Sequence, residues 1–192
     1  MSALEARGLT CRRGMATLFR DLGFRVDAGE CLAVRGANGS GKTTLLRCVA
    51  GLTRPESGTV ARVGALLYAG HLAVIKDDLT AEENLRYSLA LRGVPAVAAA
   101  TGAALAEAGL AARQQLPARR LSAGQRRRIG LARLLLDPAP LWILDEPLTA
   151  LDDEGQALFA RVMARHLEAG GLALVATHHD FAARTRAFTL AP

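Results

Sequence analysis

A glycine-rich segment at residues 36–43 has the residue types and the spacing of a phosphate-binding loop. Its glycines allow successive backbone N–H groups to turn toward one anion without obstruction by a Cβ atom. In this pattern the lysine reaches the β- and γ-phosphates, and the hydroxyl of the next residue ligates Mg²⁺. A chance glycine-rich turn ending in Lys-Thr is the alternative, at odds on the order of one per cent. The residues that we predict to bind phosphate are Gly36, Ala37, Asn38, Gly39, Ser40, Gly41, Lys42, Thr43 and Thr44, with Thr43 on the metal.

The sparing use of lysine supports this interpretation. Of 24 lysine and arginine residues, two are lysines, Lys42 and Lys76. Because arginine supplies the positive charge elsewhere, a lysine in the glycine loop indicates a need for a compact ammonium group.

Short apolar segments are expected to position this chemistry. The glycine loop follows the segment Leu32–Arg35 and precedes an expected helix over residues 42–50, and the acids Asp145 and Glu146 follow Trp142–Leu144. In parallel sheets, ligands bind at the carboxyl ends of the strands, so both loops can meet at one site. Further strands are expected at Leu4–Thr10, Leu66–Tyr68 and Leu172–Ala176.

Residues 80–136 differ in composition from the preceding part of the chain: they are rich in alanine, leucine and arginine at helical spacing. Thr80 and Ser122 each begin a capping box, in which a residue three positions later returns a hydrogen bond to the start of the helix. The helix after Ser122 is expected to run toward Leu136. We therefore predict one α/β domain over residues 1–192, with a largely parallel sheet and an inserted helical subdomain at about 80–136.

Composition limits the remaining classes. The 192 residues are 51% hydrophobic and 4% aromatic, so the core is expected to be aliphatic. The net charge of +6 is compatible with nucleic acid or an anionic membrane, or with an arginine-rich proteome. Cys11, Cys31 and Cys48 lack metal or redox spacing and are expected to be buried thiols in a reducing compartment. Because no signal-peptide layout or membrane-spanning run is present, we expect a cytoplasmic chain.

Three segments in a fixed order resemble the nucleotide-binding domain of ABC transporters. They are the glycine loop, the signature-like Leu121–Gln125 with Ala123 in place of a glycine, and Leu141–Pro147. The resemblance covers nearly the whole chain. It implies the ABC ATPase fold, which is a P-loop core with a mainly parallel sheet, antiparallel strands at the N-terminus and an inserted helical signature subdomain.

The resemblance also implies roles for the acids and one histidine. Asp145 would orient Mg²⁺, Glu146 would polarise the attacking water as general base, and His178 would sense the γ-phosphate. Asp152 lies in a segment that resembles the loop that signals to the opposite subunit. The alternatives are a helix-entry acid for Glu146, a structural histidine for His178 or its neighbour His179, and a helix cap for Asp152.

In this family two domains sandwich ATP head to tail, so a homodimer is implied. The signature helix would present its N-terminus, with Ser122, Gly124 and Gln125, to the γ-phosphate that the other copy binds. A single copy should therefore hydrolyse ATP poorly.

Two positions depart from the family pattern. Arg12-Arg13 occupies the place of the aromatic residue that stacks on adenine, and a guanidinium such as that of Arg13 can also stack on a base. His71 replaces the glutamine of the loop that contacts Mg²⁺ or water and the membrane partner. The segments Tyr68–His71 and Leu79–Leu85, with Lys76 between them, resemble the ATP-binding subunits of the haem exporters of cytochrome c maturation.

That resemblance implies an ATPase that powers release of a haem-loaded chaperone, using ATP and Mg²⁺. It would act on the cytoplasmic face of the inner membrane, bound to integral membrane subunits. No haem-ligand motif is found, so we expect no direct haem contact. ABC ATPases that act on nucleic acid usually carry a duplicated domain or long coiled coils, and because this chain has neither we expect no nucleic-acid partner. The alternatives are the ATPase of another small exporter of lipid, peptide or drug, and a non-transport ABC ATPase acting on nucleic acid. Intact Lys42, Asp145, Glu146 and His178 disfavour a non-hydrolysing subunit.

Overall fold

The computed structural model describes residues 3–62, 64–70, 75–181 and 185–190. They divide into two compact units. Residues 1–71, 139–147 and 163–192 form the first unit, and residues 72–138 and 148–162 form the second.

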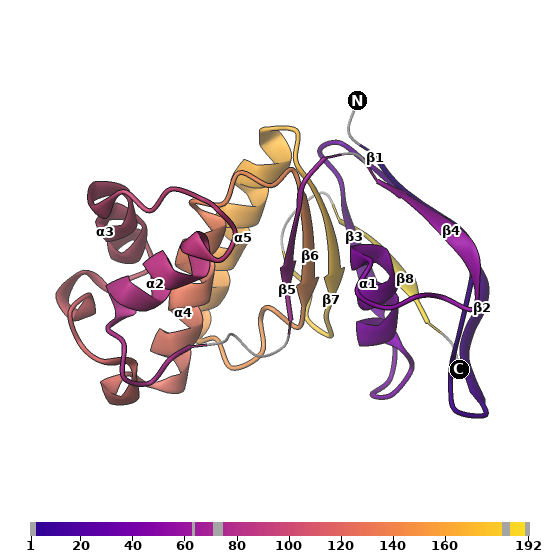
Figure 1. The fold of residues 1–192 in the computed structure, drawn as a ribbon, viewed down its shortest axis with the longest axis horizontal. Coiled ribbons are helices and arrows are strands. Elements are labelled where there is room, and N and C mark those ends of the chain that lie inside the picture. The colour runs from indigo at the N-terminus through magenta and orange to yellow at the C-terminus, as the bar shows by residue number, and fades with distance from the viewer. Residues whose placement is uncertain (1–2, 63, 71–74, 182–184, 191–192) are drawn as a thin grey trace. The chain divides into compact units, whose positions relative to one another are not determined.

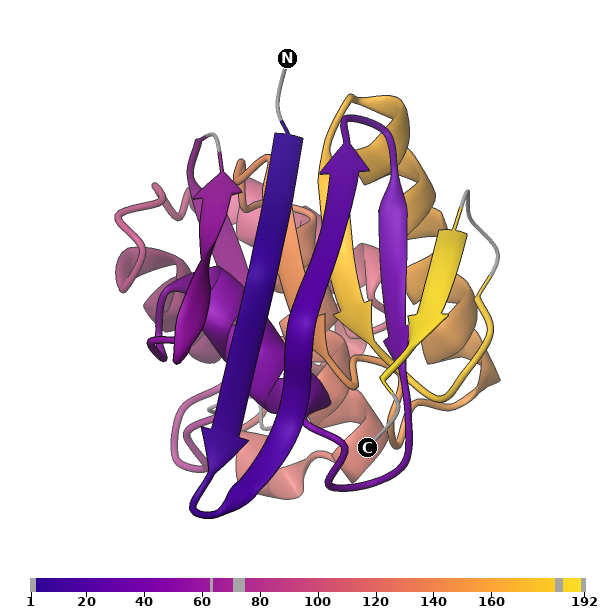
Figure 2. The same cartoon turned by 90° about the vertical axis from the view of Figure 1, so that its right-hand side faces the viewer.

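Two sheets make up the first unit. The strands β1 (Ala3–Arg13), β2 (Ala16–Asp27) and β4 (Ser57–Arg62) form an antiparallel sheet in the order β2-β1-β4, which faces the viewer in Figure 2. The second sheet is parallel, in the order β5-β6-β7-β3-β8. Its strands are β3 (Cys31–Arg35), β5 (Leu66–Ala69), β6 (Leu141–Asp145), β7 (Leu172–Ala176) and β8 (Thr185–Thr189).

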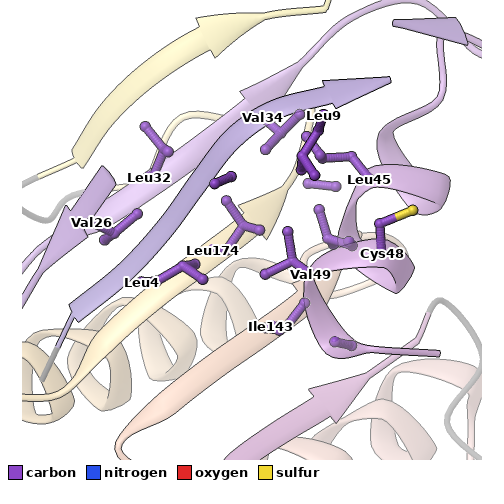
Figure 3. Packing of buried hydrophobic residues seen from close by; sticks show 14 of the residues in the cluster. Leu4, Leu9, Val26, Leu32, Val34, Leu45, Cys48, Val49, Ile143 and Leu174 are labelled. Atoms are coloured by element: carbon purple, nitrogen blue, oxygen red, sulfur yellow. The ribbon is translucent and has the colours of Figure 1, made fainter. Parts of the chain in front are cut away.

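Helix α1 (Lys42–Ala50) lies between the two sheets (Figure 1). Its Leu45, Cys48 and Val49 point into a cluster of buried side chains that also contains Leu9 of β1 and Ile143 of β6 (Figure 3). The central strands β3, β6 and β7 are buried on both faces, which explains their continuous apolar sequences. The core is aliphatic, as predicted. Its contacts with α1 hold this helix next to β3, from which the glycine loop separates it in the sequence.

The three cysteines are free and buried. Burial raises the pKa of the Cys31 thiol to about 12. Burial, with the neighbouring Cys11, also raises the pKa of Cys48 to about 12. These thiols act as small apolar side chains at neutral pH, as the sequence indicated.

The only tryptophan, Trp142 of β6, stacks on His166. Their ring centroids lie 3.6 Å apart with the planes 9° from parallel, and His166 Nε2 lies 3.2 Å from the carbonyl oxygen of Leu172. Burial lowers the pKa of His166, although the carbonyl groups of Leu172 and Pro140 oppose this effect. His166 belongs to α5 (Asp153–Glu168), which starts in the second unit and ends in the first.

The second unit is helical. It contains α2 (Ala81–Ala90), α3 (Ala98–Glu107), α4 (Ala123–Leu134) and two short 3₁₀ turns, η1 (Ala111–Arg113) and η2 (Ala118–Arg120). Both predicted capping boxes are confirmed, at Thr80 with Glu83 and at Ser122 with Gln125. Helix α4 ends at Leu134, slightly before the predicted Leu136.

Candidate active site

The glycine loop joins β3 to α1, and two of its glycines have no room for a side chain. At Gly36, φ is +144°, and a Cβ atom would lie 2.6 Å from Ser40 Oγ and 2.8 Å from the carbonyl oxygen of Leu190. At Gly41, φ is +101°, and a Cβ atom would lie 3.0 Å from that of Leu18. The backbone of the loop is thereby held in a shape that requires glycine at both positions.

Lys42 points back over this loop. Its Nζ donates to the carbonyl oxygens of Gly36 at 2.7 Å and Ala37 at 3.3 Å, and lies 3.0 Å from Nε2 of His178. The residue is 8% exposed. The ammonium group is therefore held beside the first two residues of the glycine loop, where it can attract an anion.

Two further features of the loop fit a phosphate group. Among the described residues, the buried hydroxyl of Ser40 has no hydrogen-bond partner, and Gly41 starts α1 without a side-chain cap for its N–H groups. Unpaired donors at a helix start favour a negatively charged ligand. Thr43 is exposed and Thr44 half-buried in the first turn of α1, while Ala37, Asn38 and Gly39 form the exposed part of the loop.

Asp145 and Glu146 follow β6 and differ in their surroundings. Asp145 is 4% exposed, and its charge, together with burial, raises the pKa of the nearby Tyr68. Glu146 adopts φ of +52°, and its N–H donates to the carbonyl oxygen of Ala176 at 2.9 Å. A left-handed conformation in a residue other than glycine costs on the order of 1–3 kcal/mol and persists only where the surroundings fix it. The backbone therefore sets the direction of the Glu146 carboxylate.

His178 lies between the lysine and this carboxylate. Its Nε2 is 3.4 Å from Glu146 Oε1 and 3.0 Å from Lys42 Nζ, and its side chain is 47% exposed. The same nitrogen thus faces a donor and an acceptor: it accepts from Lys42 Nζ in the tautomer protonated on Nδ1 and donates to Glu146 Oε1 in the tautomer protonated on Nε2. In the neighbouring His179 the backbone N–H donates to Thr177 Oγ1 at 3.0 Å. The first unit thus brings together the loop, Lys42, Glu146 and His178.

The second unit carries the signature residues. Ser122 Oγ accepts from the N–H of Gln125 at 3.2 Å, and Gln125 Oε1 accepts from the N–H of Ser122 at 3.1 Å. A Cβ atom on Gly124 would lie 3.7 Å from the carbonyl oxygen of Ala150. Asp152 Oδ1 accepts from the N–H of Gly155 at 3.0 Å, so Asp152 is a helix cap as well as a loop residue.

Arg13 and His71 are the two predicted residues at which the chain departs from the family pattern. Arg13 is exposed at the end of β1, whereas the guanidinium of Arg12 pairs with Glu56 at 3.2 Å. Arg13 is therefore the better placed of the two arginines to meet a base. His71 lies outside the described residues.

The described residues do not form a magnesium site from protein side chains alone. Within the described ranges, no group of three or more His, Cys, Asp or Glu side chains is placed to hold a metal ion. A hydroxyl at Thr43 and a carboxylate at Asp145 fit the usual manner of binding Mg²⁺, in which phosphates and water complete an octahedron.

Comparison with known proteins identifies the family. The family model described as ABC transporter matches residues 19–149. A cytochrome c biogenesis ATP-binding export protein CcmA from Methylococcus capsulatus is 48% identical over 188 residues, which cover 92% of this chain and 91% of the relative. The CcmA protein of Nitrosomonas europaea is 46% identical over 194 residues, covering 95% and 91% of the two chains. The chain belongs to the ABC transporter family.

Solved ABC structures share its fold. An ATP-binding ABC transporter protein from Pyrococcus furiosus superimposes with a TM-score of 0.86 at 22% identity, covering 98% of each chain. A dimeric ATP-binding cassette, solved with ADP and Pi after hydrolysis, gives a TM-score of 0.78 at 22% identity, covering 92% and 88%. The predicted fold class is confirmed. As an ABC ATPase the chain binds ATP.

One residue of interest was not predicted from the sequence. Arg128 of α4 pairs with Asp152 and, at 3.0 Å, with Glu154. The run Arg126–Arg128 was visible in the sequence, but nothing in it singled out the third arginine.

Proposed function

We propose that this chain is the ATP-hydrolysing subunit of a membrane ABC complex that exports haem for c-type cytochrome biogenesis. The observation that carries the proposal is identity of 46–48% to CcmA proteins over more than 90% of the chain. The Lys42–His178–Glu146 cluster supports hydrolysis, because a subunit that only bound nucleotide would not need a carboxylate held at the loop.

Phosphoryl transfer to water depends on positioning and on charge neutralisation. The loop N–H groups and Lys42 hold the β- and γ-phosphates, and Thr43 and Asp145 would hold Mg²⁺. The bound ion would neutralise charge that develops on the phosphate oxygens. Glu146 orients the attacking water and accepts its proton. His178 offers a ring N–H hydrogen bond to the γ-phosphate.

Residues 1–192 would act as one ABC ATP-binding domain, with residues 80–136 as its helical subdomain. Two copies would sandwich ATP, so that Ser122, Gly124 and Asp152 of one copy complete the site of the other. None of the helices in the described ranges is both long and apolar enough to cross a membrane. We place the pair on the cytoplasmic face of the inner membrane, held there by integral membrane subunits, with no direct contact to haem.

The pathway can be tested in the cell. The chromosomal gene is replaced by one carrying Glu146→Gln, with Glu168→Gln, an exposed acid near the end of α5, as the matched control. Haem staining of periplasmic c-type cytochromes should show loss of all bands in the Glu146→Gln strain only, with the apoproteins still made. Normal cytochromes in that strain would overturn the assignment and leave an exporter of another cargo.

A further inference from the structure

Arg128 is a nearly buried arginine on the signature helix α4. The residue is 8% exposed, and its side chain belongs to the second unit together with the loop 148–152. Neighbouring Arg126 has a more exposed side chain, which pairs with Asp77 at 2.8 Å. Arg128 thus differs from an ordinary solvated arginine and needs a reason for its burial.

Its guanidinium joins two acids from consecutive parts of the chain. Its Nη2 atom pairs with Asp152 Oδ2 at the end of the loop. The same atom lies 3.0 Å from Glu154 Oε2 in the first turn of α5. The other oxygen of Asp152 accepts the N–H of Gly155 at 3.0 Å. Asp152 therefore connects α4, the loop and the start of α5.

The same loop touches the signature segment itself. A Cβ atom added to Gly124 would lie 3.7 Å from the carbonyl oxygen of Ala150. Ala150 itself has φ of +58°. A left-handed alanine costs free energy, so the loop needs contacts that hold it in this shape. The pairs of Arg128 with Asp152 and Glu154 are contacts of that kind.

The surroundings are adapted to the arginine. Gly109, at φ of +72°, leaves the space that Arg128 Nη1 occupies, since a Cβ atom there would lie only 2.7 Å from that nitrogen. Burial alone would lower the pKa of Arg128, but the carboxylates of Asp152 and Glu154 raise it above its usual value. Both acids contact the same nitrogen, Nη2, and within the described part of the chain Nε is buried without a hydrogen-bond partner.

We propose that Arg128 is a positioning residue that holds the loop 148–152 against the signature helix. Ser122, Gly124 and Asp152 are thereby presented to a second copy of the chain as one preformed surface. This inference rests on the proposed ATP-dependent pairing of two copies, and it adds the residue that prepares the surface before pairing.

The first test uses the full chain in the absence of ATP, so that two copies do not pair. Hydrogen exchange is followed in peptides covering residues 148–156, for the parent, Arg128→Met, Arg128→Lys and the control Arg161→Met, an exposed arginine of α5. We expect about tenfold faster exchange of these amides in Arg128→Met, a smaller change in Arg128→Lys, and none in the control. Unchanged protection would overturn the proposal, as would equal acceleration in α2 and α4, which would indicate a general structural role.

The second test measures pairing in the Glu146→Gln background by size-exclusion chromatography with ATP. Arg128→Met should weaken pairing at least tenfold while the affinity of the single copy for a fluorescent ATP analogue stays within twofold. Combining Arg128→Met with Glu154→Gln should weaken pairing no more than the stronger single change, because both act through the contact between Arg128 and Glu154. Multiplying effects would overturn the inference. If the parent itself fails to pair, the proposed function fails, and hydrogen exchange still decides on Arg128.

Discussion

The ammonium group of Lys42 and Nε2 of His178 lie 3.0 Å apart, although 136 positions separate them in the sequence. The lysine starts the helix after β3, and the histidine follows β7, which is the neighbour of β3 in the parallel sheet. Their contact therefore results from two adjacent strands ending at the same edge. Glu146, after β6 on the other side of β7, completes the group.

Removing the ammonium should weaken nucleotide binding. In Lys42→Ala, ATP affinity should fall at least tenfold, because hydrogen bonds between charged groups contribute roughly 1.5–3 kcal/mol. The control is Lys76→Ala, which removes the only other lysine. Titration with a fluorescent ATP analogue measures both, and equal affinities would contradict the placement of phosphate at Lys42.

Glu146→Gln should slow hydrolysis and leave binding intact. Loss of a general base typically lowers kcat by about 10²- to 10⁴-fold, while the neutral amide keeps the shape of the side chain. We expect stable ATP-bound dimers as a consequence. Phosphate release and nucleotide affinity are measured alongside Glu168→Gln, and hydrolysis at the parental rate would assign the base elsewhere.

The two adjacent histidines provide a matched comparison. The side chain of His178 contacts Lys42 and Glu146. In His179 the backbone N–H donates to Thr177 Oγ1. His178→Ala should lower kcat at least tenfold, since it would remove the hydrogen bond that we propose His178 makes to the reacting phosphate. His179→Ala should remain within twofold. The opposite ranking in a steady-state ATPase assay would reverse the assignment.

The half-buried His166 should make stability depend on pH. Its pKa lies below the ordinary value of 6.5, so at lower pH the unfolded chain takes up a proton that the folded chain does not. The free energy of unfolding should therefore be highest above pH 6.5 and fall as the pH decreases through the lowered pKa. His166→Gln should reduce this fall. Urea unfolding followed by Trp142 fluorescence at pH 7.5 and 5.5 tests it, and parallel pH profiles would contradict it.

A buried ion pair in the second unit should matter more than a surface pair. The Asp137 side chain is fully buried and pairs with Arg92, whereas Asp78, which pairs with Arg119, is 89% exposed. Breaking a buried pair costs about 3–5 kcal/mol, and an exposed pair contributes roughly 0–1 kcal/mol. Asp137→Ala should therefore destabilise strongly and Asp78→Ala hardly at all in urea unfolding. Similar midpoints for both would show that the burial of Asp137 has little energetic importance.

The sequence predicted the central strands and missed several at the edges. Segments that became β3, β6 and β7 are continuous apolar runs, which only a buried strand explains well. The strands not located individually, β2, β4 and β8, each lie at the edge of a sheet. Of these, β4 and β8 are largely exposed, and the pairing of β2 is interrupted by register shifts, so none shows a regular alternation of apolar residues.

The site shows a similar division. The spacing of the glycines and the position of both loops at strand ends were sufficient to predict that Lys42 and Glu146 share one site. The left-handed backbone of Glu146 and the choice of Arg128 among three consecutive arginines were not predictable, because both depend on contacts distant in the sequence. The roles of the individual residues stay predictions until the variants are measured.

The burial of the native thiols has a practical consequence for studying pairing between copies. Thiolate is the form that reacts with maleimides and disulfides, and a pKa of about 12 leaves Cys31 and Cys48 almost entirely protonated at neutral pH. Cys11 is 5% exposed. A cysteine introduced at an exposed position, such as Met15 at 99% exposure, would therefore be the reactive thiol. Spectroscopic probes or cross-linkers could then be attached at one chosen point while all three native cysteines remain in place.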